Sequence, residues 1–356
     1  MLIRYSIGFL MASFLCMACQ HTPTTDTALV RHQEDTIGFA QYAWQMDSII
    51  SRIAPEDKLP TEATYKAVIN PHDDYAYAGG LYTKTLAGVK AKTIVLIGVA
   101  HAARDFKLEN QLIFGSYTAW DAPGGPIPVS PLRDELVEAL APKNRLVHND
   151  MIQKEHSLEA ITPFLQKQNP DIEIIPLLVP YTAFGMMQLF SDDLSKSLHS
   201  LMQKHHLEYG KDLAIVISND AIHYGSEGWS SKTMAPFGTD SIGNAKAHEK
   251  DLMIIKECLE GPLSVEKVRQ FNAYTVIPNN FRKYNWTWCG RYSTPLGLLT
   301  ANKLNLLIEN KPLVGTTIDY RSSLQNPHIE VEDIGMGHTA VATPTHWVAY
   351  VGMGYE

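Results

Sequence analysis

The chain alternates short, continuous apolar runs with longer segments whose apolar residues recur at helical spacing. Short runs are typical of strands buried on both faces, whereas the helical recurrence indicates helices packed on one side. Strands are predicted at residues 66–69, 93–97, 172–179, 213–217, 315–320 and 347–351. Helices are predicted at residues 80–90, 191–206, 244–259 and 295–307. Pro176 lacks an amide hydrogen, which favours a bulge or an edge position for its strand.

This order of elements predicts an α/β fold, a single domain with a mainly parallel central sheet flanked by helices. The domain is expected to span residues 63–356. Residues 20–62 are interpreted as a tether and an N-terminal lead-in, because the stretch after residue 19 is polar and rich in Thr. The Gly- and Pro-rich segment 120–131 is expected to be an irregular loop.

Residues 1–19 have the pattern of an export signal. Arg4 precedes an apolar stretch that is too short to span a bilayer and ends in small residues and a cysteine. The sequence CMAC at 16–19 resembles a bacterial lipobox, in which Cys19 is lipidated; the alternative is an ordinary secretory signal with an incidental cysteine. Gln20 resembles an outer-membrane sorting signal. We therefore expect a protein of the bacterial cell envelope that faces the periplasm and touches the outer membrane only through its lipid anchor.

Composition and charge exclude one class of partner. The 356 residues include 38 Asp and Glu against 30 Lys and Arg, a net charge of −8. Proteins that bind nucleic acid need clustered Lys and Arg to neutralise phosphates, and this chain has no long basic run. A nucleic-acid partner is therefore excluded. Cys258 and Cys289 follow the signal region, and in an oxidising compartment they could form a disulfide.

His72, His101 and His223 each lie a few residues after a predicted buried strand. The carboxyl ends of parallel strands meet at one edge of a sheet, where ligands bind, and imidazole is a common metal ligand. Any one of them could be an ordinary loop histidine, but the three together predict a site for iron, copper or zinc. Asp220 and Cys289 are candidate further ligands; the alternative for Cys289 is a small buried apolar residue.

Glu155, His156 and Glu159 lie in a polar segment that precedes an apolar stretch. They are candidate acid/base groups, or groups that orient a metal ligand. The alternative is the start of a helix, where the dipole favours acidic residues. Other chemistries lack their motifs, because the chain contains no G-x-S-x-G, H-E-x-x-H, G-x-x-x-x-G-K-[ST] or G-x-G-x-x-G pattern.

Six motifs occur in order from about residue 66 onwards: PHDDYAYAG, IGVAHAA, EHSLEAITPFLQ, IIPLLV, ISNDAIHYG and WCGR. Together they resemble the Memo family, whose bacterial members are called AmmeMemoRadiSam system protein B. The resemblance implies a fold similar to class III extradiol dioxygenases, which hold non-haem iron. It places metal ligands at His72, His101 and Cys289. It places further site residues at Asp220 and His223, with His223 as the acid/base group beside the metal.

The resemblance also implies a cofactor, which is iron or else copper, and redox chemistry on an unknown small molecule or peptide. The chain departs from the family pattern at Asp73 and Asp74, where the family commonly has Ala-Gly, and at Ala102, where it commonly has a second His. Two hypotheses follow. The protein is a metal-dependent redox enzyme, or it is a non-catalytic module that binds a metal or a peptide.

Overall fold

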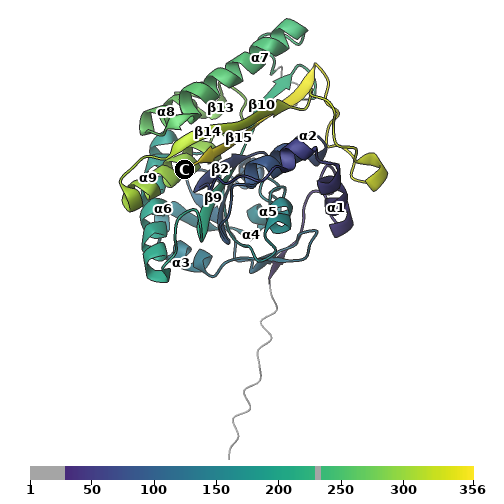
Figure 1. The fold of residues 1–356 in the computed structure, drawn as a ribbon. Helices are drawn as coiled ribbons and strands as arrows, with labels where there is room; N and C mark the ends of the chain where they lie inside the picture. The colour runs from purple at the N-terminus through teal and green to yellow at the C-terminus, as the bar shows by residue number, and fades with distance from the viewer. Residues whose placement is uncertain (1–28, 229–233) are drawn as a thin grey trace, which may run out of the picture.

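The computed structural model describes residues 29–228 and 234–356. These residues form an α/β domain in which helices pack on both faces of a ten-stranded mixed sheet (Figure 1). The predicted signal segment, with Cys19, lies outside the described residues. Within the described ranges, no helix combines the length and the apolar character needed to cross a bilayer.

The centre of the sheet is parallel, as predicted. Its four central strands are, in spatial order, β2 (Ala67–Asn70), β9 (Leu213–Ser218), β3 (Thr93–Val99) and β8 (Glu173–Val179). Their carboxyl ends therefore lie at one edge. The sheet continues beyond β8 with β4 (Leu112–Phe114) and β7 (Arg145–Val147). Beyond β2 it becomes antiparallel, with β15 (His346–Tyr355), β14 (Val314–Ser322) and β11 (Gly261–Pro262), while β10 (Asp220–Gly225) also pairs with β15.

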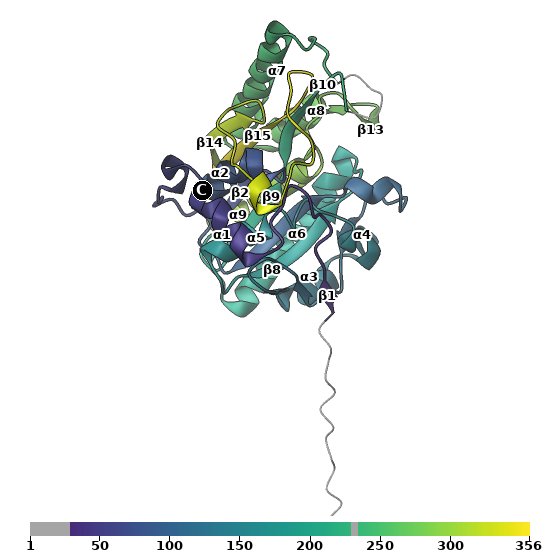
Figure 2. The same cartoon turned by 90° about the vertical axis from the view of Figure 1, so that its right-hand side faces the viewer.

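The helices divide between the two faces of the sheet. On one face lie α3 (Leu132–Ala139), α6 (Phe184–His205), α8 (Val265–Thr275) and α9 (Ser293–Glu309). On the other lie α1 (Ala43–Arg52), α2 (Tyr75–Leu86) and α5 (Thr162–Gln168). Figure 1 shows the first group to the left of the sheet and α1 and α5 to the right. Two views show α7 (Ser241–Ile254) extending away from the rest of the domain (Figures 1 and 2).

Alternate residues of the central strands belong to two separate apolar clusters, one on each face of the sheet. Val95 and Ile97 of β3 belong to the cluster beneath α6 and α9, whereas Ile94 and Leu96 belong to the cluster beneath α2 and α5. All four side chains are buried. A strand covered on both faces must be apolar at every position, which is why β3 reads as a continuous apolar run.

Smaller elements complete the described chain. A second sheet contains β1 (Val30–Arg31), β5 (Ala119–Trp120) and β6 (Ile127–Pro128), so segment 120–131 is less irregular than predicted. The remaining elements are α4 (Asn149–Gln153), the hairpin of β12 (Val276–Ile277) and β13 (Asn280–Tyr284), short 3₁₀ turns, and a π turn at Ile255–Leu259.

The interpretation of Pro176 as a bulge or edge residue was wrong. β8 pairs with β3 over its whole length with no register shift, and β4 lies on its other side. However, β4 pairs with β8 only where Ile113 faces Leu178. Pro176 therefore sits inside the sheet beside a gap in the second ladder, where a missing amide hydrogen costs little.

Candidate metal centre

The edge at the carboxyl ends of three adjacent strands carries the predicted histidines. His72 follows β2 and His101 follows β3. Asp220 is the first residue of β10 and comes two residues after the end of β9, the strand between them. Chain connectivity therefore delivers these residues to one point, as expected for an open α/β sheet.

His72, His101 and Cys289 form a group whose potential ligand atoms lie within 4.8 Å of one another. The two imidazole rings are 5.3 Å apart between centroids, and Nε2 of His101 lies 2.8 Å from Sγ of Cys289. His72 and Cys289 are buried, whereas His101 retains 35% of its side-chain exposure. The group therefore has one open side.

Cys289 reaches the histidines because its backbone is fastened to β10. Its amide donates to the carbonyl of Asp220 at 3.1 Å, and the preceding Trp288 forms a bridge with Ile222. Asp251 on α7 fixes the same segment by accepting hydrogen bonds from the indoles of Trp286 and Trp288, both at 2.7 Å. The cysteine is thus held by contacts remote in sequence.

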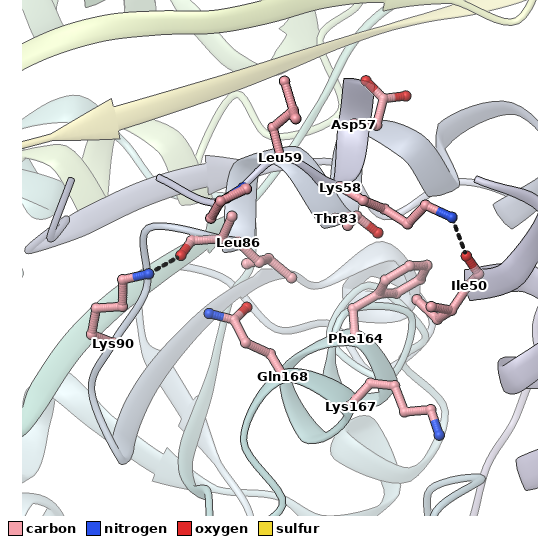
Figure 3. A pocket seen from close by; sticks show the side chains of 12 residues that line it. Ile50, Asp57, Lys58, Leu59, Thr83, Leu86, Lys90, Phe164, Lys167 and Gln168 are labelled. Atoms are coloured by element: carbon pink, nitrogen blue, oxygen red, sulfur yellow. Dashed lines mark hydrogen bonds between the residues drawn. The ribbon is translucent and has the colours of Figure 1, made fainter. Parts of the chain in front are cut away.

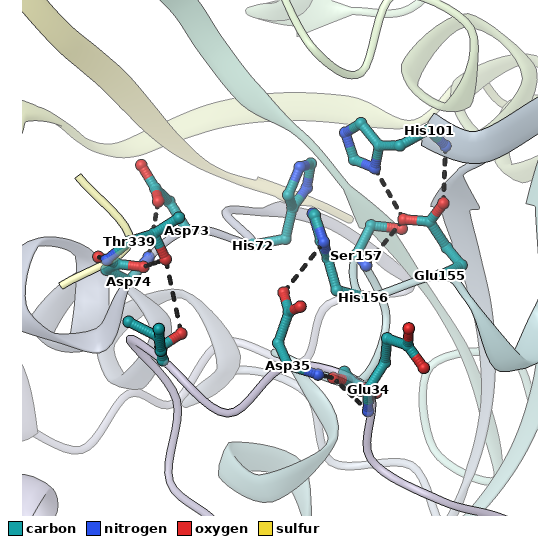
Figure 4. Close-up of polar contacts among 12 residues, drawn as sticks. Glu34, Asp35, His72, Asp73, Asp74, His101, Glu155, His156, Ser157 and Thr339 are labelled. Carbon is teal, nitrogen blue, oxygen red and sulfur yellow. Dashed lines mark hydrogen bonds and ion pairs between the residues drawn. The ribbon is translucent and has the colours of Figure 1, made fainter. Parts of the chain in front are cut away.

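Both histidines are oriented by a partner on Nδ1. The hydroxyl of Ser218 donates to the carbonyl of Ser157 at 2.7 Å and lies 2.8 Å from Nδ1 of His72, from which it accepts. A carboxylate oxygen of Glu155 accepts from Nδ1 of His101 at 2.7 Å (Figure 4). In each neutral ring Nε2 is left as the lone-pair nitrogen. Such partners are typical of metal-binding histidines, whose orientation they fix.

Burial and neighbouring charges shift the pKa of each of these groups. Burial lowers the pKa of His72 well below its ordinary value, and the neighbouring histidines lower it further, so the ring is neutral. Burial would raise the pKa of Glu155, but His101 and the amide of Ser157 hold that pKa at about 2. Burial also opposes the charged form of His101, yet Glu155 reverses this and leaves the pKa of His101 above its ordinary value.

The donor set fits a transition metal. Burial raises the pKa of the Cys289 thiol to about 12, so without a metal the thiol stays protonated and its S–H donates a hydrogen bond to Nε2 of His101. A metal ion would replace that proton, and two imidazoles with one thiolate suit iron, copper or zinc better than calcium or magnesium. His72, His101 and Cys289 would hold the ion, as the sequence predicts.

Asp220 and His223 stand beside this group. One oxygen of Asp220 accepts from the amide of His72 at 2.9 Å, and the other lies 3.2 Å from its Nε2. Burial, with the charges of Asp73 and Cys289, raises the pKa of Asp220 well above its ordinary value, so this carboxyl keeps a proton. Burial lowers the pKa of His223 to about 3, so its ring is neutral.

A pocket of about 200 Å³ opens onto the group. It is lined by the side chains of six residues, His101, His223, Met234, Tyr284, Thr287 and Cys289. Arg291 is buried behind this lining, with its guanidinium 3.8 Å from the centroid of the Tyr284 ring. The volume suits a small molecule.

The residues of the predicted polar segment 154–159 have different roles. Glu155 orients His101, and the ring of His156 lies 4.7 Å from that of His101. Glu159 instead forms a buried ion pair with Arg31, away from the histidines. The alternative of a helix start was wrong, because Glu155 and His156 lie in irregular backbone, Glu159 lies in a turn, and α5 begins only at Thr162.

The two carboxylates that depart from the family pattern are structural anchors. Asp73 accepts from the hydroxyl of Tyr350 at 2.7 Å, and Asp74 accepts from the amide and the hydroxyl of Thr339, both at 2.6 Å. Burial and the charge of Asp73 raise the pKa of Asp74 to about 7. Cys258 and Cys289 are both free thiols, so the conditional disulfide is not formed.

A larger pocket, of about 310 Å³, lies between α1, α2 and α5 (Figure 3). Its floor is apolar, with Leu86 and Phe164, and the ammonium groups of Lys58 and Lys90 donate to backbone carbonyls at its rim. Its lining includes no histidine or cysteine, and its one acid, Asp57, is paired with Arg321. The smaller pocket is the candidate site because His101 and Cys289 of the metal group line it.

Sequence comparison identifies the family to which this site belongs. A family model described as "Memo-like protein" matches residues 40–333, which include every residue of the metal group. The chain belongs to the Memo-like protein family. This confirms both the predicted resemblance and the predicted fold class, because the sheet and helices described above form the α/β architecture that the resemblance implied.

Curated relatives are about one-quarter identical to this chain over aligned stretches of 162 to 184 residues. A MEMO1 family protein of Thermotoga neapolitana is 27% identical over 163 residues, 44% of this chain and 53% of that protein. One from Pyrobaculum aerophilum is 27% identical over 162 residues, 44% and 52% of the two chains. One from Thermotoga maritima is 24% identical over 184 residues, 49% and 60%. The chain thus aligns with about half the length of these relatives.

Proposed function

We propose that this Memo-like protein is a metal-dependent redox enzyme that acts on a small molecule, with iron, or else copper, as its cofactor. One observation carries the proposal. Two imidazoles and a thiol, those of His72, His101 and Cys289, offer their ligand atoms within 4.8 Å of one another, and His101 and Cys289 line a pocket. When bound there, iron or copper would supply one-electron chemistry and a coordination position for oxygen or substrate.

The residues around the group support proton transfer. Asp220 keeps a proton because of its burial, and His223 is a neutral base that lines the pocket. A neutral imidazole can take a proton from a substrate, and a protonated carboxyl can return one to a product. We assign His223 the role of base, Asp220 the role of acid, and His156 the role of a further polar contact.

The test combines metal analysis with oxygen uptake. Protein purified without added metal is analysed for metal, then loaded with Fe(II) or with copper and supplied with small reducing substrates such as catechols. We expect one metal ion per chain and oxygen consumption, both lost in a His72→Ala/His101→Ala variant. His199→Ala/His205→Ala, which removes two histidines of α6, is the matched control and should keep both. Absence of metal in the wild type contradicts the metal site. Metal without turnover contradicts the enzyme and favours a binding module.

We also propose that the protein works in the bacterial cell envelope, held at the outer membrane through a lipid on Cys19. The lipobox-like sequence at 16–19 supports this. Cys19→Ser should move the protein from the membrane fraction to the soluble periplasmic fraction, and mass spectrometry should detect acyl chains on the wild-type N-terminus. A wild-type protein recovered without acyl chains would refute the anchor.

A further inference from the structure

The larger pocket between α1, α2 and α5, called here the lysine-rimmed pocket, combines an apolar interior with a basic rim (Figure 3). Its volume of about 310 Å³ lies at the lower end of the range of small-molecule sites. It shares no lining residue with the pocket at the metal group. An occupant would therefore be a ligand other than the substrate of the proposed redox reaction.

The interior of the lysine-rimmed pocket is apolar because hydrophobic side chains of three helices line it. Leu86, the last residue of α2, and Phe164, in the first turn of α5, are buried, and Ile50 of α1 is half-buried. Leu59 also lines the pocket, yet it is 65% exposed. An apolar ligand chain that entered the cavity would remove part of this exposed surface from water.

The rim carries three exposed lysines, Lys58, Lys90 and Lys167 (Figure 3). The ammonium groups of Lys58 and Lys90 donate to backbone carbonyls at distances of 2.6 to 3.4 Å, two for each lysine. Among the described residues neither ammonium has an acidic partner, whereas Lys167 forms an ion pair with Asp47. Because an ammonium has three donors, Lys58 and Lys90 each keep one for a ligand.

The acid that lines the pocket does not offset these charges. Asp57 is buried, and its carboxylate accepts from both terminal nitrogens of Arg321. The pocket therefore has an excess of positive charge, although the whole chain carries a net charge of −8. Clustered charges of one sign beside an apolar wall attract a ligand of the opposite sign.

We propose that the lysine-rimmed pocket binds a free carboxylic acid with one unbranched apolar chain, such as a medium-chain fatty acid. The chain would lie against Leu86 and Phe164, and the carboxylate would accept from Lys58 or Lys90. The volume suits one short chain. The lining contains no arginine, so it lacks the planar fork that binds phosphate or sulfate through two parallel hydrogen bonds.

The test titrates the full-length protein with octanoate by isothermal titration calorimetry, and we expect one octanoate per chain. Hexanoate, which has two methylenes fewer, should bind about 15-fold more weakly, since each buried methylene contributes about fourfold. Octanol, which has no charge, should bind about tenfold more weakly than octanoate. Octyl sulfate should bind no more tightly than octanoate.

A pair of lysine substitutions tests the charged rim. Lys58→Gln/Lys90→Gln should weaken octanoate about tenfold, to the affinity of octanol, and should leave the binding of octanol unchanged. Lys143→Gln/Lys196→Gln removes two exposed lysines outside the pocket, so it is the matched control and should behave as the wild type.

Two further substitutions test the apolar interior. Thr83 of α2 is half-buried and lines the pocket, so Thr83→Phe should fill the cavity and abolish octanoate binding, with urea unfolding as the check that the variant is folded. Leu59→Ser changes an exposed side chain, so it should leave the fold intact. It should weaken octanoate and octanol alike, by about fivefold.

Several outcomes overturn the inference. They are octanol binding as tightly as octanoate, octyl sulfate binding more tightly, and unchanged octanoate affinity in Lys58→Gln/Lys90→Gln or in folded Thr83→Phe. A wild type that binds no octanoate overturns it as well. Octanoate affinity should be the same with and without added Fe(II), because the two pockets share no residue; a difference would place the ligand at the metal group instead.

Discussion

The buried carboxyl of Asp251 should make the free energy of unfolding depend on pH, and Asp251→Asn should remove this dependence. The carboxylate is fully buried and accepts from the indoles of Trp286 and Trp288 and, through its other oxygen, from the amide of Ile222 and the hydroxyl of Tyr320. Burial raises the pKa of Asp251 from 3.8 to about 6, and the hydrogen bonds keep it from rising further.

The raised pKa of Asp251 determines whether the free energy of unfolding rises or falls with pH. The folded state holds the Asp251 proton up to about pH 6, whereas the unfolded chain releases it near 3.8. This contribution to stability is therefore fully present below pH 3.8 and is lost as pH rises through about 6. A separation of about two pH units corresponds to ~3 kcal/mol, of which about 2 kcal/mol is lost between roughly pH 4.5 and pH 8.

Asp251→Asn removes this titration because an amide is neutral at every pH. We expect the free energy of unfolding of the wild type, minus that of the variant, to fall by about 2 kcal/mol between roughly pH 4.5 and pH 8. Urea unfolding of metal-free protein, followed by tryptophan fluorescence, measures both. Glu249→Gln, which replaces an exposed carboxylate on the same helix, is the control and should keep the wild-type slope. A difference that stays constant with pH, or that grows as pH rises, would refute the reasoning.

Three further substitutions test the contact that orients His101, the packing of β3 and the buried ion pair of Arg31. Glu155→Gln should weaken metal binding by about 10- to 100-fold in competition with a chromophoric chelator, because the histidine that it orients loses a charged partner; equal affinity would contradict this. Gly98→Ala should lower the free energy of unfolding by about 1–3 kcal/mol, because the new Cβ would lie 2.7 Å from Cγ of Leu158. Arg31→Met should cost about 3–5 kcal/mol by leaving Glu159 buried without its cation, and Arg31→Met/Glu159→Gln should recover part of it; both are read from urea unfolding.

The buried strands could be predicted from the sequence because burial on both faces leaves an uninterrupted apolar run, as at residues 93–97. The strands β4 and β7 could not, since three residues are too few to show a period. The start of α2 was placed too late. Its first turns are buried nearly all round, from Tyr75 to Gly80, and therefore carry no polar face to mark a helix.

Only part of the site could be predicted, from the order of the strands along the chain and from the sequence motifs. His72 and His101 follow buried strands, and Cys289 was a candidate ligand, so the sequence brings these three into consideration. Asp251 carries no such signal. It is an acidic residue in a polar stretch, and its role arises from a contact with a segment far away in the chain. Tertiary packing alone assigns that role.

The division of the core into two clusters has a consequence for how this protein can diverge. Side chains of Val95 and Ile94 point to opposite faces and pack with different helices. Replacements on one face are therefore compensated by neighbours on that face, and distant pairs on opposite faces should add in free energy. Each apolar cluster can therefore accumulate its own substitutions while the backbone of the central strands, which lies between the two clusters, stays unchanged.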